Sequence, residues 1–200
     1  MNTKPFLIAA FLAAFALPAF AQAPQGTPTN VRGKITKISG QTLTVKTREG
    51  ASVDIALAPT TGVRTLVKKK LSDIKTGDNV ASTSIPGKDG KLHAIELHFL
   101  PAAVPESQSP YDLKPGSLMT NAHVNGIATA KSGGTLTVTF QGKTTDVVVD
   151  SKTKIVGPAD GAMSDLKAGK AVFVRATKAA DGSLSSSSVT VEKGGVKPPM

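Results

Sequence analysis

The sequence contains no cysteine and no tryptophan, and it has a single tyrosine. Without cysteine the chain can form no disulfide, no thiolate metal site and no thiol nucleophile, and it offers no cysteine for a lipid anchor. It also lacks a Gly-x-Ser-x-Gly elbow, a His-Glu-x-x-His pair and a phosphate-binding glycine loop followed by lysine. These absences remove the common catalytic signatures. We therefore expect a protein that is not an enzyme and has no cofactor.

Aromatic residues are also scarce, and four of the seven phenylalanines fall within the first 20 residues. In that segment, Lys4, an apolar run over 6–17 and the small residues of Ala19-Phe20-Ala21 match the three regions of a secretory signal peptide. The sequence thus predicts a signal peptide over 1–21, with Ala21-Gln22-Ala23 as the alternative cleavage site. The remaining chain must build its core from aliphatic residues.

No later apolar stretch approaches the length of a bilayer span, so we expect no membrane span after signal removal. The mature protein would reside in the periplasm or, alternatively, be secreted. Residues 22–30 are rich in Pro, Gln, Thr and Gly without apolar periodicity, and they are predicted to be a flexible leader.

The chain carries an internal repeat. Ser72-Asp73-Ile74-Lys75-Thr76-Gly77 returns 92 positions later as Ser164-Asp165-Leu166-Lys167-Ala168-Gly169. Upstream, Gly33/Gly126 and Leu43/Leu136 differ by 93 positions, which places a one-residue loss in the second copy between Val138 and Gly142. A length change confined to a turn is expected of two copies of one fold.

Each copy alternates apolar and polar residues in short segments rich in Thr and Val, a pattern typical of β-strands. Ser72 is expected to cap one helical turn before the fourth strand, with Gly77 as its left-handed exit residue. Gly33 and Gly126 fall inside predicted strands, where a bulge or barrel bend is expected. The strand that contains Ser185-Ser186-Ser187-Ser188 is expected to be an edge or loosely packed.

We therefore predict an all-β protein of two tandem, small, OB-like, five-stranded antiparallel barrels. The predicted modules cover 31–100 and 122–193. A Pro-rich linker over 101–121 joins them, and a flexible tail covers 194–200. Part of the linker, around Tyr111-Asp112-Leu113, is apolar enough that it should pack on a module.

The quoted repeat resembles a known family. Leu71-Ser72-Asp73-Ile74-Lys75-Thr76-Gly77-Asp78 and Asp89-Gly90-Lys91-Leu92-His93-Ala94, together with Gly33 and the strand over 40–45, resemble the bacterial domain of unknown function 5666 family. The resemblance implies exported OB-like barrels, often in tandem, and brings no catalytic signature.

Aspartates present in both copies are predicted to serve the fold as cap, turn and strand-surface residues, because Asp is common at caps and turns. The pairs are Asp54/Asp146, Asp73/Asp165 and Asp89/Asp181.

A basic run distinguishes the first copy, since Lys68-Lys69-Lys70 stands where the second copy has Asp160-Gly161-Ala162. Residues 31–100 hold 12 basic and 6 acidic residues, against 9 and 6 in 124–193. Arg64, Lys68, Lys69 and Lys70 are therefore candidates for binding a polyanion, although a solvated charge run that keeps the protein soluble is the favoured interpretation. Because OB-fold proteins bind single strands by stacking bases on aromatics, specific nucleic-acid binding is not expected.

The three histidines offer a weaker signal for a metal. His93 and His98 are five residues apart on one strand and should face opposite sides, whereas Glu96 and His98 share a face. Glu96 and His98 are the candidate ligands, and a third would require the linker to bring His123 close.

The function expected from the sequence is thus an exported, non-enzymatic binding or scaffolding protein of the cell envelope. Its partner would be an envelope protein or a polyanion. A polyanion or envelope-surface binder and a metal-handling accessory protein are the two alternatives.

Overall fold

The computed structural model describes residues 26–198. The predicted signal peptide (1–21) lies outside the described residues, as do residues 22–25 of the predicted leader. The remainder of that leader is already structured, because β1 begins at Thr27 and pairs with β11 from Thr27↔Lys178 onward.

The described chain is all-β, as predicted, with twelve strands and two single turns of 3₁₀ helix. The strands are β1 (Thr27–Ser39), β2 (Thr42–Thr47), β3 (Ser52–Lys68), β4 (Asn79–Pro86), β5 (Leu92–Phe99), β6 (Ser107–Pro110), β7 (Leu118–Ala130), β8 (Gly133–Phe140), β9 (Lys143–Asp150), β10 (Lys154–Asp160), β11 (Ala171–Lys178) and β12 (Leu184–Val191). The 3₁₀ turns are η1 (Leu71–Asp73) and η2 (Met163–Asp165). No helix among residues 26–198 is both long and apolar enough to cross a membrane.

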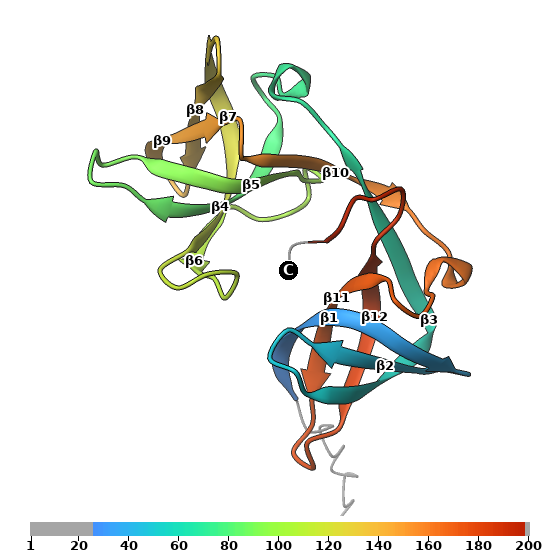
Figure 1. The fold of residues 1–200 in the computed structure, drawn as a ribbon. Helices are drawn as coiled ribbons and strands as arrows, with labels where there is room; N and C mark the ends of the chain where they lie inside the picture. Colours follow the sequence, from blue (N-terminus) through green and yellow to red (C-terminus); the bar gives the residue numbers. More distant parts are fainter. Residues whose placement is uncertain (1–25, 199–200) are drawn as a thin grey trace, which may run out of the picture.

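The strand pairings close into two five-stranded rings, which lie apart in Figure 1. The first ring runs β1-β2-β3-β12-β11 and returns to β1, and its single parallel pairing is β3 with β12. The second ring runs β7-β8-β9-β5-β4 and returns to β7, with β5 and β9 as its parallel pair. Each ring is a small barrel around its own core.

The prediction of two tandem barrels is wrong, because each ring mixes strands from both halves of the chain. The first ring takes β1–β3 from the first half and β11–β12 from the second, and the second ring takes β7–β9 and β4–β5. The sequence-contiguous modules 31–100 and 122–193 therefore do not correspond to the two rings. The exchange occurs because β3 continues for 17 residues and carries the chain from one ring to the other.

Both cores are almost entirely aliphatic, as the scarcity of aromatics predicted, and Phe140 is the one aromatic among their buried residues. Each core contains residues from both halves of the chain. The first is Val31, Ile35, Leu43, Val45, Ile55, Leu57, Val63, Leu166, Val172, Val174, Ala176, Val189 and Val191. The second is Ile74, Val80, Leu92, Leu97, Ala122, Val124, Leu136, Val138, Phe140, Val147 and Val149. Burying these side chains is the main favourable term in folding, and it requires both halves together.

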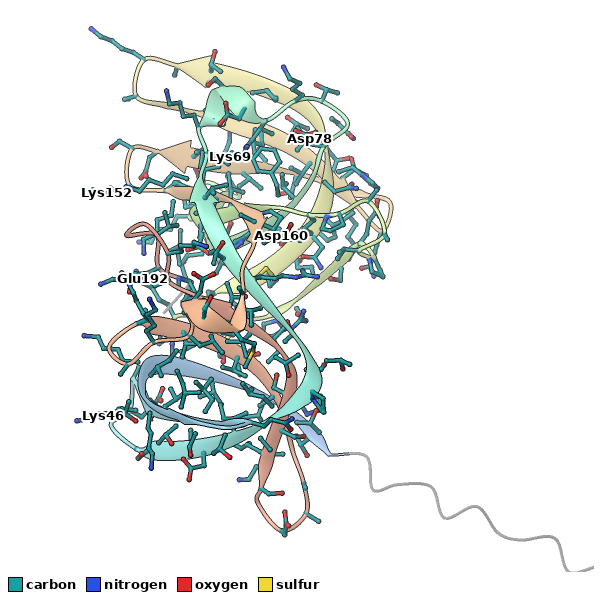
Figure 2. All side chains as sticks on the ribbon, turned by 90° about the vertical axis from the view of Figure 1, so that its right-hand side faces the viewer. Lys46, Lys69, Asp78, Lys152, Asp160 and Glu192 are labelled. Carbon is teal, nitrogen blue, oxygen red and sulfur yellow. The ribbon has the colours of Figure 1, made fainter. Side chains whose placement is uncertain are left out.

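A two-stranded bridge connects the rings. The second part of β3, from Arg64 to Lys68, pairs antiparallel with β10, and β10 also pairs in parallel with β5. The segment from Pro59 to Lys68, where the apolar alternation of the sequence stops, is therefore strand. Figure 2 shows β3 running from the lower ring to the upper one, with Lys69 near its upper end.

The two 3₁₀ turns are capped in the same way. The Asp73 carboxylate accepts a hydrogen bond from the Lys70 backbone N–H (2.8 Å), and the Asp165 carboxylate accepts one from the Ala162 N–H (2.9 Å). Lys70, not Ser72 as predicted, is thus the N-cap residue. The predicted exit glycine Gly77 does have a left-handed conformation, with φ of +93°.

The other shared aspartates also hold the matched structural roles that were predicted. Asp54 accepts a hydrogen bond from Thr44 Oγ1 (2.7 Å), as Asp146 does from Thr137 Oγ1 (3.0 Å). In the hairpin turns, Asp89 and Asp181 accept backbone N–H groups two residues further along the chain.

Gly33 and Gly126 are not equivalent in the structure, although the sequence pairs them. The bulge of β1 lies between Ile35 and Lys37, away from Gly33, whereas that of β7 lies between Val124 and Gly126. Gly126 therefore borders a bulge, as predicted. Gly33 instead allows a close approach of two strands, since an added Cβ would collide with the Lys46 carbonyl oxygen.

The strand with the serine run is not an edge, contrary to prediction. β12 lies between β11 and β3, and Ser186 is buried. The Ser186 hydroxyl is 2.7 Å from the Arg175 carbonyl oxygen and 2.9 Å from that of Ser188, both within hydrogen-bonding reach. Hydrogen bonding to the backbone makes a small polar residue acceptable at a buried position.

We predict that Gly33→Ala lowers the free energy of unfolding by about 1–3 kcal/mol, because the methyl group must displace backbone. Gly126→Ala is the matched control. Its Cβ would lie 3.6 Å from Thr137 Cβ, an ordinary contact, so its effect should stay within about 0.5 kcal/mol. Thermal unfolding followed by circular dichroism measures both, and equal losses in the two variants would contradict the assignment.

Candidate functional site

The bridge brings basic residues from both halves of the chain together. Arg64 and Lys68 lie on β3 an even number of residues apart, so their side chains share one face of the strand. On the neighbouring strand, Lys154 lies at the start of β10. The Lys69 N–H donates to the Ile155 carbonyl (2.8 Å), so the strand register continues past Lys68 and places Lys70 opposite Lys154.

The backbone of Lys70 is extended, as in a strand. We define the bridge face as Arg64, Lys68, Lys70 and Lys154. All four side chains are exposed, and none forms an ion pair with a residue between 26 and 198. Asp160 lies opposite Arg64 across the strand pair and is the nearest acid on that strand. The face therefore carries an excess of positive charge at the junction of the two rings.

Lys69 does not belong to this face, although it was a candidate with its neighbours. Its stem covers Gly157, where an added Cβ would lie 3.1 Å from Lys69 Cε, and its Nζ lies 5.8 Å from the centre of the Phe99 ring. Strand alternation turns Lys69 to the opposite side from Lys68 and Lys70. A lysine run in a strand thus contributes to two surfaces.

Lys154 was missed by the sequence reasoning because it belongs to the other half of the chain. It lies 84 positions after Lys70, and only the β3–β10 pairing makes the two neighbours. The excess of basic residues in 31–100 signalled part of the surface. The charge from the second half could be found only through the fold.

The candidate metal ligands Glu96 and His98 do lie together on β5. Glu96 is only 2% exposed, and its carboxylate is hydrogen-bonded to His98 Nε2. This confirms that the two side chains share a face. The contact pairs the Glu96 carboxylate with the imidazole of His98.

The other two histidines are engaged elsewhere. His93 Nε2 lies 3.1 Å from the Asp89 carboxylate, and His123 Nε2 lies 3.1 Å from Glu106. Among the residues that the structure describes, no three His, Cys, Asp or Glu side chains are grouped as a metal would require. The arrangement that would have brought His123 to His98 and Glu96 does not form.

A second polar site fastens the linker to the first ring. The Arg32 guanidinium on β1 is stacked between the Tyr111 ring (5.1 Å from its centre) and the Phe173 ring (4.7 Å). Its Nη1 donates to the Asp112 carboxylate at 2.7 Å. We call Arg32, Tyr111, Asp112 and Phe173 the latch. The predicted packing of Tyr111-Asp112-Leu113 is thereby confirmed.

Arg32 is deeply buried by these contacts, with 3% of its surface exposed. Its Nε and Nη2 atoms are buried without a hydrogen-bond partner, so Asp112 and the two rings provide what compensates its charge. At the edge of the latch, Arg48 Nη2 donates to the Asp112 carbonyl oxygen (2.8 Å). Asp112 of the linker is therefore held through its carboxylate by Arg32 and through its backbone carbonyl by Arg48.

The latch shifts the titration of its own members. Burial alone would raise the pKa of the Asp112 carboxyl. The hydrogen bond and positive charge of Arg32, together with a hydrogen bond from Asn30, outweigh burial and lower this pKa overall. Burial raises the pKa of the Tyr111 hydroxyl.

Two open hollows lie outside the bridge face. One, of about 560 Å³, is lined by the linker loop from Pro110 to Leu118 together with Arg48. The other, of about 340 Å³, lies on the first ring and is lined by residues that include Arg175, Ser185 and Ser187. Neither contains Glu96, His98 or a residue of the bridge face.

No protein-family model matches the chain, and neither a curated protein nor a solved structure matches it. The function is therefore argued from the geometry and charge of the chain itself.

We predict that Asp112→Asn destabilises the protein by about 1–2 kcal/mol at neutral pH, because it leaves the buried Arg32 charge without its carboxylate. The sign of the pH dependence follows from the lowered pKa of Asp112. Its stabilisation is present above the ordinary value of 3.8 and is lost as the pH falls through the lower folded value. The difference in Tm between wild type and variant should therefore be constant from about pH 7 to 5 and shrink below about pH 4.

Tyr111 is the only tyrosine and the chain has no tryptophan, so intrinsic fluorescence reports directly on the latch. Asp112→Asn should change that emission, whereas Asp181→Asn, in a distant hairpin turn, should not. Unchanged emission in Asp112→Asn together with an unchanged Tm would contradict the role of the latch.

We also predict that zinc or copper gives no saturable heat at micromolar protein, because Glu96 and His98 supply two ligands that already bond to each other. Isothermal titration calorimetry measures this, with a His98→Ala variant as the reference. Stoichiometric uptake that disappears in His98→Ala would restore the metal hypothesis.

Proposed function

We propose that this chain is an exported, non-enzymatic binding or scaffolding protein of the cell envelope, and that it binds polyanions through the bridge face. Export rests on the signal-peptide pattern of residues 1–21. The observation that carries the binding surface is the convergence of Arg64, Lys68, Lys70 and Lys154 on neighbouring strands.

We further propose that each ring is an OB-like barrel. In both rings three antiparallel strands are followed by a closing parallel pair, and a 3₁₀ turn precedes the remaining two-stranded hairpin. This order supports the resemblance to exported OB-like modules. It is here distributed over two halves of the chain.

The charge of the bridge face supports recognition of a polyanion. The chain carries a formal net charge of +10, and none of the four cations of the bridge face forms an ion pair with a residue between 26 and 198. Exposed lysines repel one another and are stabilised when an extended anion neutralises them. Lipopolysaccharide and anionic lipid are polyanions of the envelope with suitable chemistry.

The aromatic residues favour charge over base stacking as the means of recognition. Phe140 lies in the second core, Tyr111 and Phe173 enclose Arg32, and Phe99 lies beneath Lys69. All the aromatics of residues 26–198 are therefore used in packing. Specific reading of single-stranded nucleic acid would need exposed rings.

We predict that the protein binds fluorescent heparin at low salt and that binding weakens steeply as salt rises, because the attraction is screened and counterions are released. Changing Lys68, Lys70 and Lys154 together to Gln should weaken binding at least about tenfold, since about 1.4 kcal/mol distributed over three contacts produces that change.

The control variant changes Lys88, Lys143 and Lys178 to Gln. These exposed lysines lie at or near hairpin ends, far apart in the sequence. Their substitution removes the same net charge as the first triple variant, but from dispersed positions. Its affinity should fall by less than about threefold, the small effect expected of unfocused charge. Equal losses in both triple variants would show that net charge alone, and not the bridge face, attracts the polyanion.

A further inference from the structure

The register of the bridge shows how the two halves are related. Leu66 on β3 pairs with Pro158 on β10, and these residues are separated by the same 92 positions that relate the repeated sequence segments. On either side, Lys68 pairs with Val156 and Arg64 with Asp160. Adding 92 to the β3 residue of either pair gives the β10 residue of the other, since Arg64 corresponds to Val156 and Lys68 to Asp160. A twofold axis through Leu66 and Pro158 produces this pattern.

The rings agree with that axis pair by pair. Leu43 pairs with Ile55 in the first ring as Leu136 pairs with Val147 in the second. The closing parallel pairs also match, with Leu184 beside Ile55 and Leu92 beside Val147.

The bulges of β1 and β7 occupy matching places too. Lys34 pairs with Ala171 and His123 with Asn79, which makes Lys34 and His123 equivalent. The β1 bulge, between Ile35 and Lys37, and the β7 bulge, between Val124 and Gly126, then begin at the same distance from these residues. Each half therefore presents the same two surfaces, a three-stranded sheet and a two-stranded hairpin.

These surfaces bury apolar side chains only against the other half. Leu166, Val172 and Val189 of the second half complete the core of the first ring. Ile74, Val80 and Leu97 of the first half complete the core of the second ring. Such contacts resemble a divided domain core, as in obligate twofold dimers.

We infer that the two halves recognise each other as a strand-exchanged, twofold pair, and that this interface fits the matching half of a second copy of the chain. The linker is then a tether that raises the effective concentration of one half for the other, so the intact chain pairs with itself. The latch adds a contact of the same kind, since Arg32 belongs to the first half and Asp112 to the linker that precedes the second.

The test uses the full chain with a specific protease site inserted between Ala102 and Ala103, both of which are exposed. After cleavage under native conditions, light scattering should still report one particle with the mass of the intact chain, 20.5 kDa before signal removal and insertion. The two halves should separate only in denaturant. Release of two half-sized particles from the native protein would overturn the inference.

A second measurement does not depend on the cut protein remaining assembled. Lys68→Cys and Val156→Cys place thiols on a directly opposed pair in a chain without other cysteines. Since the adjacent Lys69–Ile155 pair is hydrogen-bonded, this pair lies at a non-hydrogen-bonded site, where Cα atoms are closest and a cross-strand disulfide can form. Oxidation before cleavage should keep the halves together on a non-reducing gel, and two separate bands would refute the bridge.

Exchange with a second copy is tested by mixing cleaved protein tagged on the first half with isotopically heavy, untagged cleaved protein. After joint unfolding and refolding, tag capture should recover heavy second halves. Recovery of light second halves alone would show that the interface does not accept a second copy. Mixing without unfolding is the control, and it should exchange far more slowly because each core must open.

Discussion

Closure of each barrel depends on a two-stranded hairpin from the other half of the chain: β11–β12 completes the sheet of β1–β3, and β4–β5 completes that of β7–β9. The parallel pairings β3–β12 and β5–β9 join strands from opposite halves, and without them each three-stranded sheet would expose an apolar face and two unpaired edges. Each hydrophobic core contains residues from both halves, so each is complete only when its own closing hairpin is in place. The two rings are therefore coupled in stability in a way that two independent tandem domains would not be.

The same crossing creates the surface to which we assign binding. Two strands that travel between the rings must run side by side, and their pairing brings Lys154 next to a basic segment from the first half. On one side of the bridge the stem of Lys69 covers Gly157, and on the other lie the cations of the bridge face, none of which forms an ion pair with a residue between 26 and 198. Meanwhile the latch places the buried Arg32 between the aromatic side chains of Tyr111 and Phe173, and this packing holds the linker against the first barrel.

Several features could be predicted from the sequence because they depend on local physics. Alternation identified most strands, the Asp of each 3₁₀ turn was recognised as structural, and Gly77 was assigned its left-handed conformation. Gly33 and Gly126 are not equivalent because the β7–β8 hairpin is longer than the β1–β2 hairpin. A comparison of residue types along the sequence does not reveal this difference in length. The serine strand was misplaced for a related reason: its burial is set by partners from the other half.

By itself, the sequence determined most of the strand-forming segments, the largely aliphatic character of the cores, the absence of disulfides and the structural use of the repeated aspartates. These follow from side-chain period, composition and turn chemistry, which act over a few residues. Only the tertiary structure decided which half completes which barrel, that Lys69 turns away from Lys68 and Lys70, and that Arg32 is buried beneath Tyr111. Two equivalent hairpins fit either sheet equally well by pattern, so the choice rests on whether β3 bends back or continues, and that is settled by long-range pairing.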